Sequence, residues 1–300
     1  MNGNQLTYDA GFQDQDIFLR DILSARLRLS RSLVTRLKQQ SRIRVNGSVA
    51  LTNRRIHAGD RITVDLDFAE RNELIPEPIP LTIIYQDEDF LVVDKPAGLA
   101  THPARRGGTG TLANAVTYYW QEQGRDFRFR PINRLDKDTS GLVLIGKSQF
   151  AHQGIFGRGH CRLLERSYTA LVEGRLEQDA GRIDRPIARL DDYSRRRLVS
   201  PDGQPAVTLY QVLARYPEHT LLALQLETGR THQIRVHLSS LGHPLCGDLL
   251  YGQPSPLIGR QALHAGRLRF VQPRSGEIVS LETHLPQDMR RAIAGLERIG

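Results

Sequence analysis

The chain has 300 residues, of which 39% are hydrophobic, and its formal net charge is +8. This length allows one large or two smaller domains with a sizeable core. Two cysteines, Cys161 and Cys246, are too few for a disulfide framework. With no signal-peptide pattern and no long apolar run, we expect a cytoplasmic protein.

The positive charge is concentrated near the N-terminus. Between Arg20 and Arg61, 11 Lys and Arg residues accompany only two acidic residues, so this segment carries +9 and the remainder −1. Such a concentration is typical of a surface that binds the phosphate backbone of a nucleic acid. The alternative is a small domain whose basic side chains only solvate one face.

Residues 1–70 show the pattern of a small α+β domain. Apolar residues recur at helical spacing over 17–27, and Ser30 can cap a second helix that carries basic residues on its outer face. A strand over 43–45 then enters an Asn46-Gly47 turn, and residues 61–66 alternate as a closing strand.

The segments LSRSLVTRLKQQSRIRVNG and HAGDRITV resemble the small RNA-binding domain first known from ribosomal small-subunit protein four. The resemblance implies a basic helix that faces structured RNA. The candidate RNA-binding residues are Arg31, Arg36, Lys38, Arg42 and Arg44.

Residues 71–80 form a proline-rich linker, which we expect to be a stiff spacer with few residues able to pack. A second domain over 81–300 is predicted next. Its apolar runs read mostly as strands that are neighbours in sequence, with a helix capped by Thr111. We therefore predict an α+β fold with a largely antiparallel mixed sheet.

The stretch from Arg134 to Leu144 is a polar turn that leads into an apolar strand. Asp136 lies between Arg134 and Lys137, and cationic neighbours favour an ionised carboxylate. An ionised carboxylate at the end of a strand can act as a nucleophile or a base. The alternative is an ordinary solvated turn, since Asp, Thr, Ser and Gly all favour turns.

The second domain resembles the ribosomal large-subunit (RluA-type) family of pseudouridine synthases over residues 81–285. The resemblance is carried by VVDKPAGLATHP, NRLDKDTSGLVLIGKS, ERSYTALVEG, ETGRTHQIRVHLSSLGHPLCGDLLYG and LHAGRLRF. The family typically has His before Arg-Leu-Asp, where this chain has Asn133. We expect Asn133 to be tolerated because either side chain can form local hydrogen bonds.

The resemblance implies an isomerase that detaches uracil from ribose, turns it and rejoins it through carbon, without cofactor or metal. It implies that Asp136 is the essential carboxylate, that Tyr168 packs against the base and that Arg235 pairs with Asp136. Arg134 would fill the gap left by a flipped nucleotide. Whether Asp136 acts as nucleophile or base stays open at this point.

Each of these residues has a simpler interpretation. Tyr168 could be an ordinary strand aromatic, and Arg235 a surface charge on an amphipathic helix. His232 and His237 suggest a metal site, but their five-residue spacing places them on different faces of a helix, so we expect no metal. The turn at Asp136 begins like a calcium loop, but Lys147 stands where the bidentate Glu would be.

We therefore predict a monomeric RNA pseudouridine synthase whose partner is ribosomal RNA, with no membrane association. Transfer RNA is the alternative substrate. A non-catalytic RNA-binding or ribosome-assembly factor is the alternative from another class. A nucleotide-binding oxidoreductase would depend only on a weak glycine pattern at Gly108 and Gly110.

Overall fold

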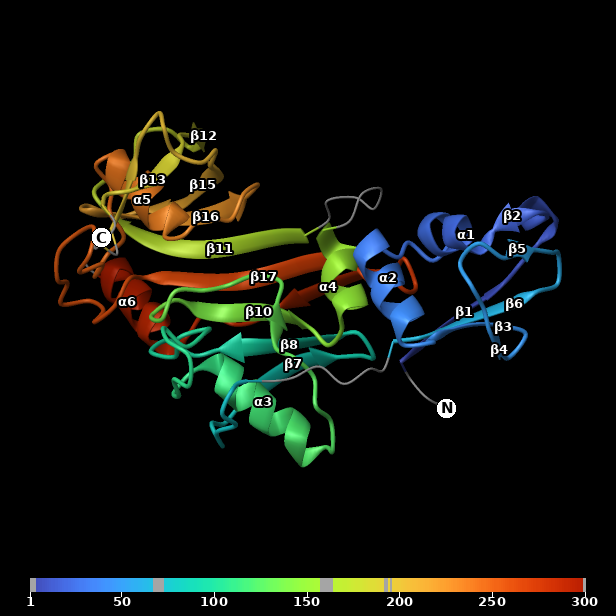
Figure 1. Ribbon diagram of the computed structural model, residues 1–300. Coiled ribbons are helices and arrows are strands. Elements are labelled where there is room, and N and C mark those ends of the chain that lie inside the picture. The colour runs from blue at the N-terminus through green and yellow to red at the C-terminus, as the bar shows by residue number, and fades with distance from the viewer. Residues whose placement is uncertain (1–3, 67–72, 157–163, 192–193, 195, 299–300) are drawn as a thin grey trace.

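The structure is a computed structural model, and it describes residues 4–66, 73–156, 164–191, 194 and 196–298. Two large sheets that share no strand organise the described residues, and two further two-stranded sheets accompany them (Figure 1). We call residues 4–66 the N-terminal part and the described residues from 81 onward the C-terminal part. Cys161 lies outside the described residues, and Cys246 is buried.

The N-terminal part is a four-stranded antiparallel sheet, in the order β1-β6-β3-β4, with two helices packed on it. Its elements are β1 (Gln5–Asp9), the 3-10 helix η1 (Phe12–Asp14), β2 (Ile17–Phe18), α1 (Leu19–Ala25), α2 (Arg31–Gln39), β3 (Ile43–Val45), β4 (Ser48–Val49), β5 (Arg55–Ile56) and β6 (Arg61–Asp65).

Local sequence signals explain these elements. The Ser30 hydroxyl accepts a hydrogen bond from the Leu33 amide (3.2 Å) and so caps α2 as predicted. Asn46 and Gly47 both have positive φ (52° and 81°), which suits the tight turn between β3 and β4. The first helix is shorter than predicted, because Ile17 pairs in β2 and α1 begins only at Leu19.

The C-terminal part contains a ten-stranded sheet in the order β12-β15-β16-β11-β17-β10-β8-β7, to which β18 and β9 add at β17 and β10. Its elements are β7 (Thr82–Gln86), β8 (Phe90–Lys95), α3 (Leu112–Glu122), β9 (Arg130–Pro131), β10 (Ser140–Gly146), α4 (Gln149–Phe156), β11 (Leu164–Glu173), β12 (Ala180–Asp184), β13 (Ile187–Arg189), β14 (Arg197–Val199), β15 (Val207–Arg215), β16 (His219–Leu226), α5 (Gln233–Ser240), β17 (Leu263–Val271), β18 (Ile278–Glu282) and α6 (Gln287–Glu297).

Helices cover both faces of this sheet (Figure 1). In β10, Val143 and Ile145 pack with α3 and α5, whereas Leu142 and Leu144 pack with α4 on the opposite face. All seven residues of β10 are buried, which explains its nearly continuous apolar sequence. The predicted α+β fold with a largely antiparallel mixed sheet is confirmed.

Among the described strand pairs, only β10 and β17 run parallel, where Ser140 lies opposite His264 and Gly141 opposite Ala265. Gly141 has a φ of 118°, and a Cβ atom there would lie 2.3 Å from the Ala265 carbonyl oxygen. Only glycine allows this close approach. Gly141 therefore joins the two halves of the sheet directly beside the Asp136 turn.

The proline-rich segment packs more closely than predicted. The Asn114 side chain, at the start of α3, donates to the Ile75 carbonyl (2.7 Å), and the Glu77 carboxylate accepts from the Gly110 amide (2.6 Å). Leu74 packs against the large core. A proline has no N–H to donate, so nearby carbonyls need other donors, and here Asn114 of α3 supplies one. Residues 74–77 therefore contact α3 and the large core of the C-terminal part.

Candidate active site

Asp136 lies in the loop between β9 and β10, and its side chain is about one-quarter exposed (24%). The neighbouring Leu135 is buried, and both of its backbone groups bind the hydroxyl of Thr101. That hydroxyl donates to the Leu135 carbonyl (2.7 Å) and accepts from the Leu135 amide (3.2 Å). The Asp136 carbonyl accepts from the Thr139 amide (3.1 Å), which closes the turn. The carboxylate is thus held on a fixed backbone.

Asn133 supports the same loop from the other side. Its amide nitrogen donates to the Leu142 carbonyl (3.0 Å), and its oxygen accepts from the Leu144 amide (2.8 Å). The expected local hydrogen bonding by Asn in place of His is therefore present, and it ties the loop to β10.

Replacing Asn133 by Ala should lower the free energy of unfolding by about 1–3 kcal/mol, because it leaves a buried N–H and a buried carbonyl unsatisfied. Urea denaturation followed by the fluorescence of the single tryptophan, Trp120, would measure this loss. Asn133→His is the matched control. An imidazole can donate with one nitrogen and accept with the other, so this variant should remain close to wild type. An Asn133→Ala protein as stable as wild type would contradict this role.

Arg235 is buried on α5 and bridges two carboxylates. Its Nη1 lies 2.9 Å from Oδ2 of Asp136. Its Nε and Nη2 form a fork with Oδ2 and Oδ1 of Asp248, at 2.7 and 2.8 Å. Burial opposes the charge of Arg235, but the hydrogen bonds and charges of Asp248 and Asp136 outweigh it and raise the pKa of Arg235. The predicted contact with Asp136 is present, and the surface-charge interpretation of Arg235 is wrong.

Asp248 is a residue that sequence reasoning missed. Its side chain is fully buried, and its Oδ1 also accepts from the amides of Leu250 and Tyr251 (3.0 and 3.2 Å). The available signal was a single acidic residue inside the apolar run HPLCGDLLYG. A lone carboxylate in such a run needs a cation, and Arg235 supplies it.

Two histidines near Arg235 have distinct surroundings. His232 has left-handed φ (58°), lies with Nε2 3.8 Å from Oδ2 of Asp136, and pairs through Nδ1 with the Tyr251 hydroxyl (2.9 Å). His237 is buried, and its two nitrogens pair with the Thr208 hydroxyl and the Arg185 carbonyl, both at 2.9 Å. Burial lowers the pKa of both rings. These hydrogen bonds give His237 a structural role and use the nitrogens that a metal would need.

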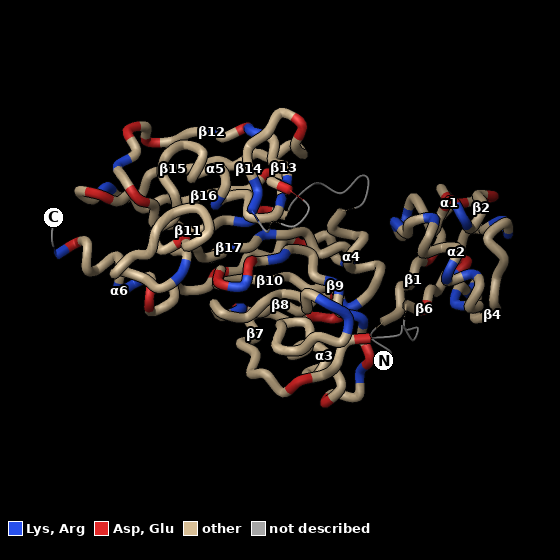
Figure 2. The backbone as a smooth tube through the Cα atoms, turned by 60° about the vertical axis from the view of Figure 1, so that its left-hand side comes forward, with Lys and Arg blue, Asp and Glu red and all other residues tan. Residues whose placement is uncertain are grey.

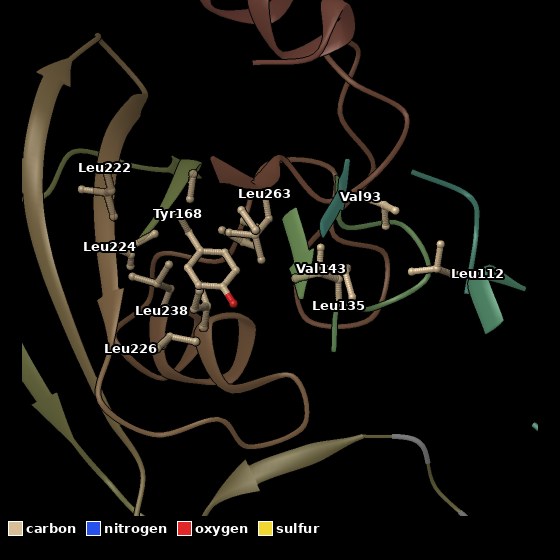
Figure 3. Close-up of a cluster of buried hydrophobic side chains, with 14 of the residues drawn as sticks. Val93, Leu112, Leu135, Val143, Tyr168, Leu222, Leu224, Leu226, Leu238 and Leu263 are labelled. Carbon is tan, nitrogen blue, oxygen red and sulfur yellow. The ribbon is translucent and has the colours of Figure 1, made fainter. Parts of the chain in front are cut away.

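Tyr168 lies on β11 with only 6% of its surface exposed. Figure 3 shows its ring packed among leucines of β16, α5 and β17, including Leu224, Leu238 and Leu263. Burial raises the pKa of its hydroxyl. The ring is therefore a rigid apolar surface, although it also forms part of the core as the simpler interpretation expected.

These residues meet at one cavity of about 400 Å³. Asp136, Arg235 and Tyr168 all line it. Three further arginines, Arg134, Arg166 and Arg230, also line it, of which Arg134 and Arg230 are exposed. The four candidate catalytic residues are thus brought together in a hollow with one carboxylate, an apolar ring and a cationic rim.

Known proteins are similar to this chain in sequence and in fold. A family model described as RNA pseudouridylate synthase matches residues 89–240. The chain belongs to the RNA pseudouridylate synthase family. It is accordingly an isomerase that acts on RNA, and the predicted RluA-type membership is confirmed.

Relatives match the synthase over most of its length. The uncharacterized RNA pseudouridine synthase YhcT of Bacillus subtilis is 42% identical, over 91% of this chain and 91% of its own. Ribosomal large subunit pseudouridine synthase D of Nitrosomonas europaea is 38% identical, over 92% and 86%. The solved structure of human RNA pseudouridylate synthase domain containing 4 aligns with a TM-score of 0.57 at 27% identity, covering 72% of this chain and 93% of that one.

Lys95 is a second residue of the synthase that sequence reasoning missed. Its ammonium group is fully buried behind the Asp136 loop and donates to the carbonyls of Pro96, Leu99 and Lys137, at 2.9, 2.7 and 3.1 Å. Burial lowers the pKa of Lys95 to about 8, and the charge of Asp136 opposes that shift. Lys95 thereby places a positive charge behind the carboxylate. The signal was a lysine directly after an apolar strand.

The predicted RNA-binding residues of the synthase lie in different environments. Arg42 forms an ion pair with Asp65, and Arg36 turns toward Gln149 of the C-terminal part (3.4 Å). Figure 2 shows Lys and Arg over the helices of the N-terminal part. The remaining candidates are exposed: Arg31, Lys38 and Arg44. Within the described residues, no helix is long and apolar enough to span a membrane.

Proposed function

We propose that this synthase converts specific uridines of large-subunit ribosomal RNA to pseudouridine, with Asp136 as the essential carboxylate. This proposal rests mainly on how Arg235 divides its hydrogen bonds between Asp248 and Asp136. Its fork is held by the buried Asp248, so only Nη1 reaches Asp136. Within the described part of the chain, Oδ1 of Asp136 accepts no hydrogen bond, and this oxygen is available to a ribose in the cavity.

The other residues of the cavity support the same chemistry. The reaction breaks the bond from uracil N1 to the ribose, forms a bond from C5 to the same ribose carbon, and moves the C5 proton to solvent while N1 gains one. The rigid Tyr168 ring is placed to pack beneath a base during this rotation. Arg134, exposed at the rim, is suited to occupy the position of an extruded nucleotide.

The proposed target RNA is inferred from the name of a relative. Ribosomal large subunit pseudouridine synthase D of Nitrosomonas europaea covers nearly the whole chain. Mapping pseudouridines in ribosomal and transfer RNA from cells that lack this synthase should reveal sites missing from large-subunit RNA. Cells that express Asp136→Asn should lack the same sites. Sites missing only from transfer RNA would give the alternative substrate, and unchanged RNA would favour a non-catalytic assembly factor.

We also propose that residues 1–70 and 81–300 are two domains and that the first binds RNA through its exposed cations. Replacing Arg31, Lys38 and Arg44 together by Gln should weaken RNA binding and flatten its dependence on salt. The expected change is about 0.7–0.9 in the slope of log K against log salt for each lost phosphate contact. Fluorescence anisotropy with labelled ribosomal RNA at several salt concentrations would measure it.

The matched control replaces Arg290, Arg291 and Arg298 by Gln. These side chains are exposed on and after α6, and the total charge changes by the same amount. The control should keep the wild-type slope. Equal slopes for the two triple variants would show that the N-terminal part does not bind the RNA.

A further inference from the structure

The two parts of the synthase contact each other through a defined interface between α2 and α4 (Figure 1). The Ser30 hydroxyl, which caps α2, also donates to the Gln153 side chain of α4, and the Gln153 amide lies 3.5 Å from the Ser32 hydroxyl. Phe150 of α4 is only 5% exposed and belongs to the apolar core of the N-terminal part. The N-terminal core is therefore completed by a side chain from the C-terminal part.

Arg274 reinforces this interface from the turn between β17 and β18. Its Nε and Nη2 form a fork with the buried Asp89, at 2.9 and 2.8 Å. Its Nη1 donates to the Gln5 carbonyl of β1 (2.9 Å), and its guanidinium carbon lies 5.7 Å from the centre of the Phe150 ring. A fork held by a buried carboxylate is rigid, so the third N–H presents a fixed contact to the N-terminal part.

The interface places basic residues of both parts beside each other. Burial of Arg130 on β9 lowers its pKa to about 10, and the positive charge of the nearby Arg36 on α2 contributes to the same shift. Arg134 follows four residues later at the rim of the cavity. Figure 2 shows this second concentration of cations near β9, which the net charge of −1 outside residues 20–61 conceals.

We propose that the α2–α4 interface, held by Arg274, fixes the distance between the RNA-binding surface and the cavity, and so determines which uridine is modified. An RNA segment bound along α2 would continue over Arg130 to Arg134, and only a uridine at the matching spacing would reach Asp136. This inference rests on the proposed function. Phe150, Gln153 and Arg274 are then positioning residues, since they lie outside the cavity.

The first test locks the interface in the full-length chain. Ser32→Cys with Gln153→Cys, in a Cys161→Ser background, should be joined across the interface by a short bismaleimide, which spans the gap that two cysteine side chains leave where the Gln153 amide reached Ser32. The probe is unmodified large-subunit ribosomal RNA labelled with tritium at uridine C5. The cross-linked protein should keep its kcat and KM within about twofold of the Cys161→Ser protein treated with the same reagent, because the locked arrangement is the active one. Failure of the two cysteines to be joined, or a larger loss of activity in the joined protein, would overturn the proposal.

The second test loosens the interface. Gln149→Ala with Gln153→Ala removes polar contacts from exposed or half-buried positions, so the protein should still fold. We expect KM to rise severalfold with little change in kcat, and pseudouridine to appear at uridines neighbouring the normal site. Gln121→Ala with Gln123→Ala, two exposed residues at the end of α3, is the matched control and should behave as wild type.

The outcomes separate this inference from the proposed function. If the wild-type protein shows no tritium release that depends on Asp136, the proposed function fails. If the wild-type protein is active but the loosened variant keeps its KM and its choice of uridine, only the inference about spacing fails.

Discussion

Asp136→Asn should fold normally and release no detectable tritium from C5-labelled uridine in substrate RNA. The amide is nearly isosteric, and its oxygen can still accept from Nη1 of Arg235, which lies 2.9 Å from the native carboxylate. It cannot act as nucleophile or base, so the rate should fall at least about 10²-fold for either role. Thermal unfolding should show a melting temperature close to that of wild type.

Asp138→Asn is the matched control for this variant. Asp138 lies on the same turn and lines no part of the cavity, and the structure uses its backbone carbonyl, which accepts from Nη1 of Arg260 (3.0 Å). This variant should keep nearly full activity. If Asp136→Asn retained more than about a tenth of the wild-type rate, Asp136 would not be the essential carboxylate.

Arg235→Ala should lose both activity and stability. It leaves Asp248 fully buried without its cation, which typically costs about 3–5 kcal/mol of unfolding free energy. It also removes the partner that orients Asp136. Arg235→Lys keeps the charge but not the fork, so it should recover only part of the stability. Urea denaturation and tritium release measure the two effects.

A double variant separates packing from chemistry at Arg235, and a variant of an exposed ion pair elsewhere is its control. Replacing the pair by Arg235→Met with Asp248→Asn removes both buried charges and keeps an oxygen that accepts from the amides of Leu250 and Tyr251, so it should restore much of the stability without restoring turnover. Arg267→Ala removes an exposed ion pair with Glu282 and should change stability by less than about 1 kcal/mol. A stable, fully active Arg235→Ala protein would show that the bridge from Asp248 to Asp136 has no function.

Local signals in the sequence predicted local structure well. The cap at Ser30 and the turn at Asn46-Gly47 depend on residues close in sequence, and the structure has both. The contact of Asp136 with Arg235 spans 99 residues, and the pairing was predicted from resemblance to a family, with support from the apolar neighbours of Arg235, which indicated that a buried arginine there needs a carboxylate. Local reasoning alone could not have found it, because side-chain pairs at such separations depend on the packing of the whole sheet.

The same dependence on distant packing explains why two residues of the site were missed. Asp248 and Lys95 act through partners that other segments bring to them, and neither has a spacing pattern of its own. The parallel pairing of β10 with β17 was also not predicted, since it joins strands more than 100 residues apart. The docking of α4 on the N-terminal part was hidden by the proline-rich segment, which suggested an independent spacer.

The parallel pairing of β10 with β17 should also determine when the Asp136 loop can form during protein synthesis. Ser140, just beyond the Asp136 turn, lies opposite His264, and Gly141 is pressed against Ala265. A ribosome that has made β10 must add more than 100 further residues before this partner strand emerges. Domains generally fold as units, and contacts between distant residues form slowly. We therefore expect that a nascent chain cannot assemble the cavity until residues 263–271 have left the ribosome, and that a chain truncated before β17 does not modify RNA.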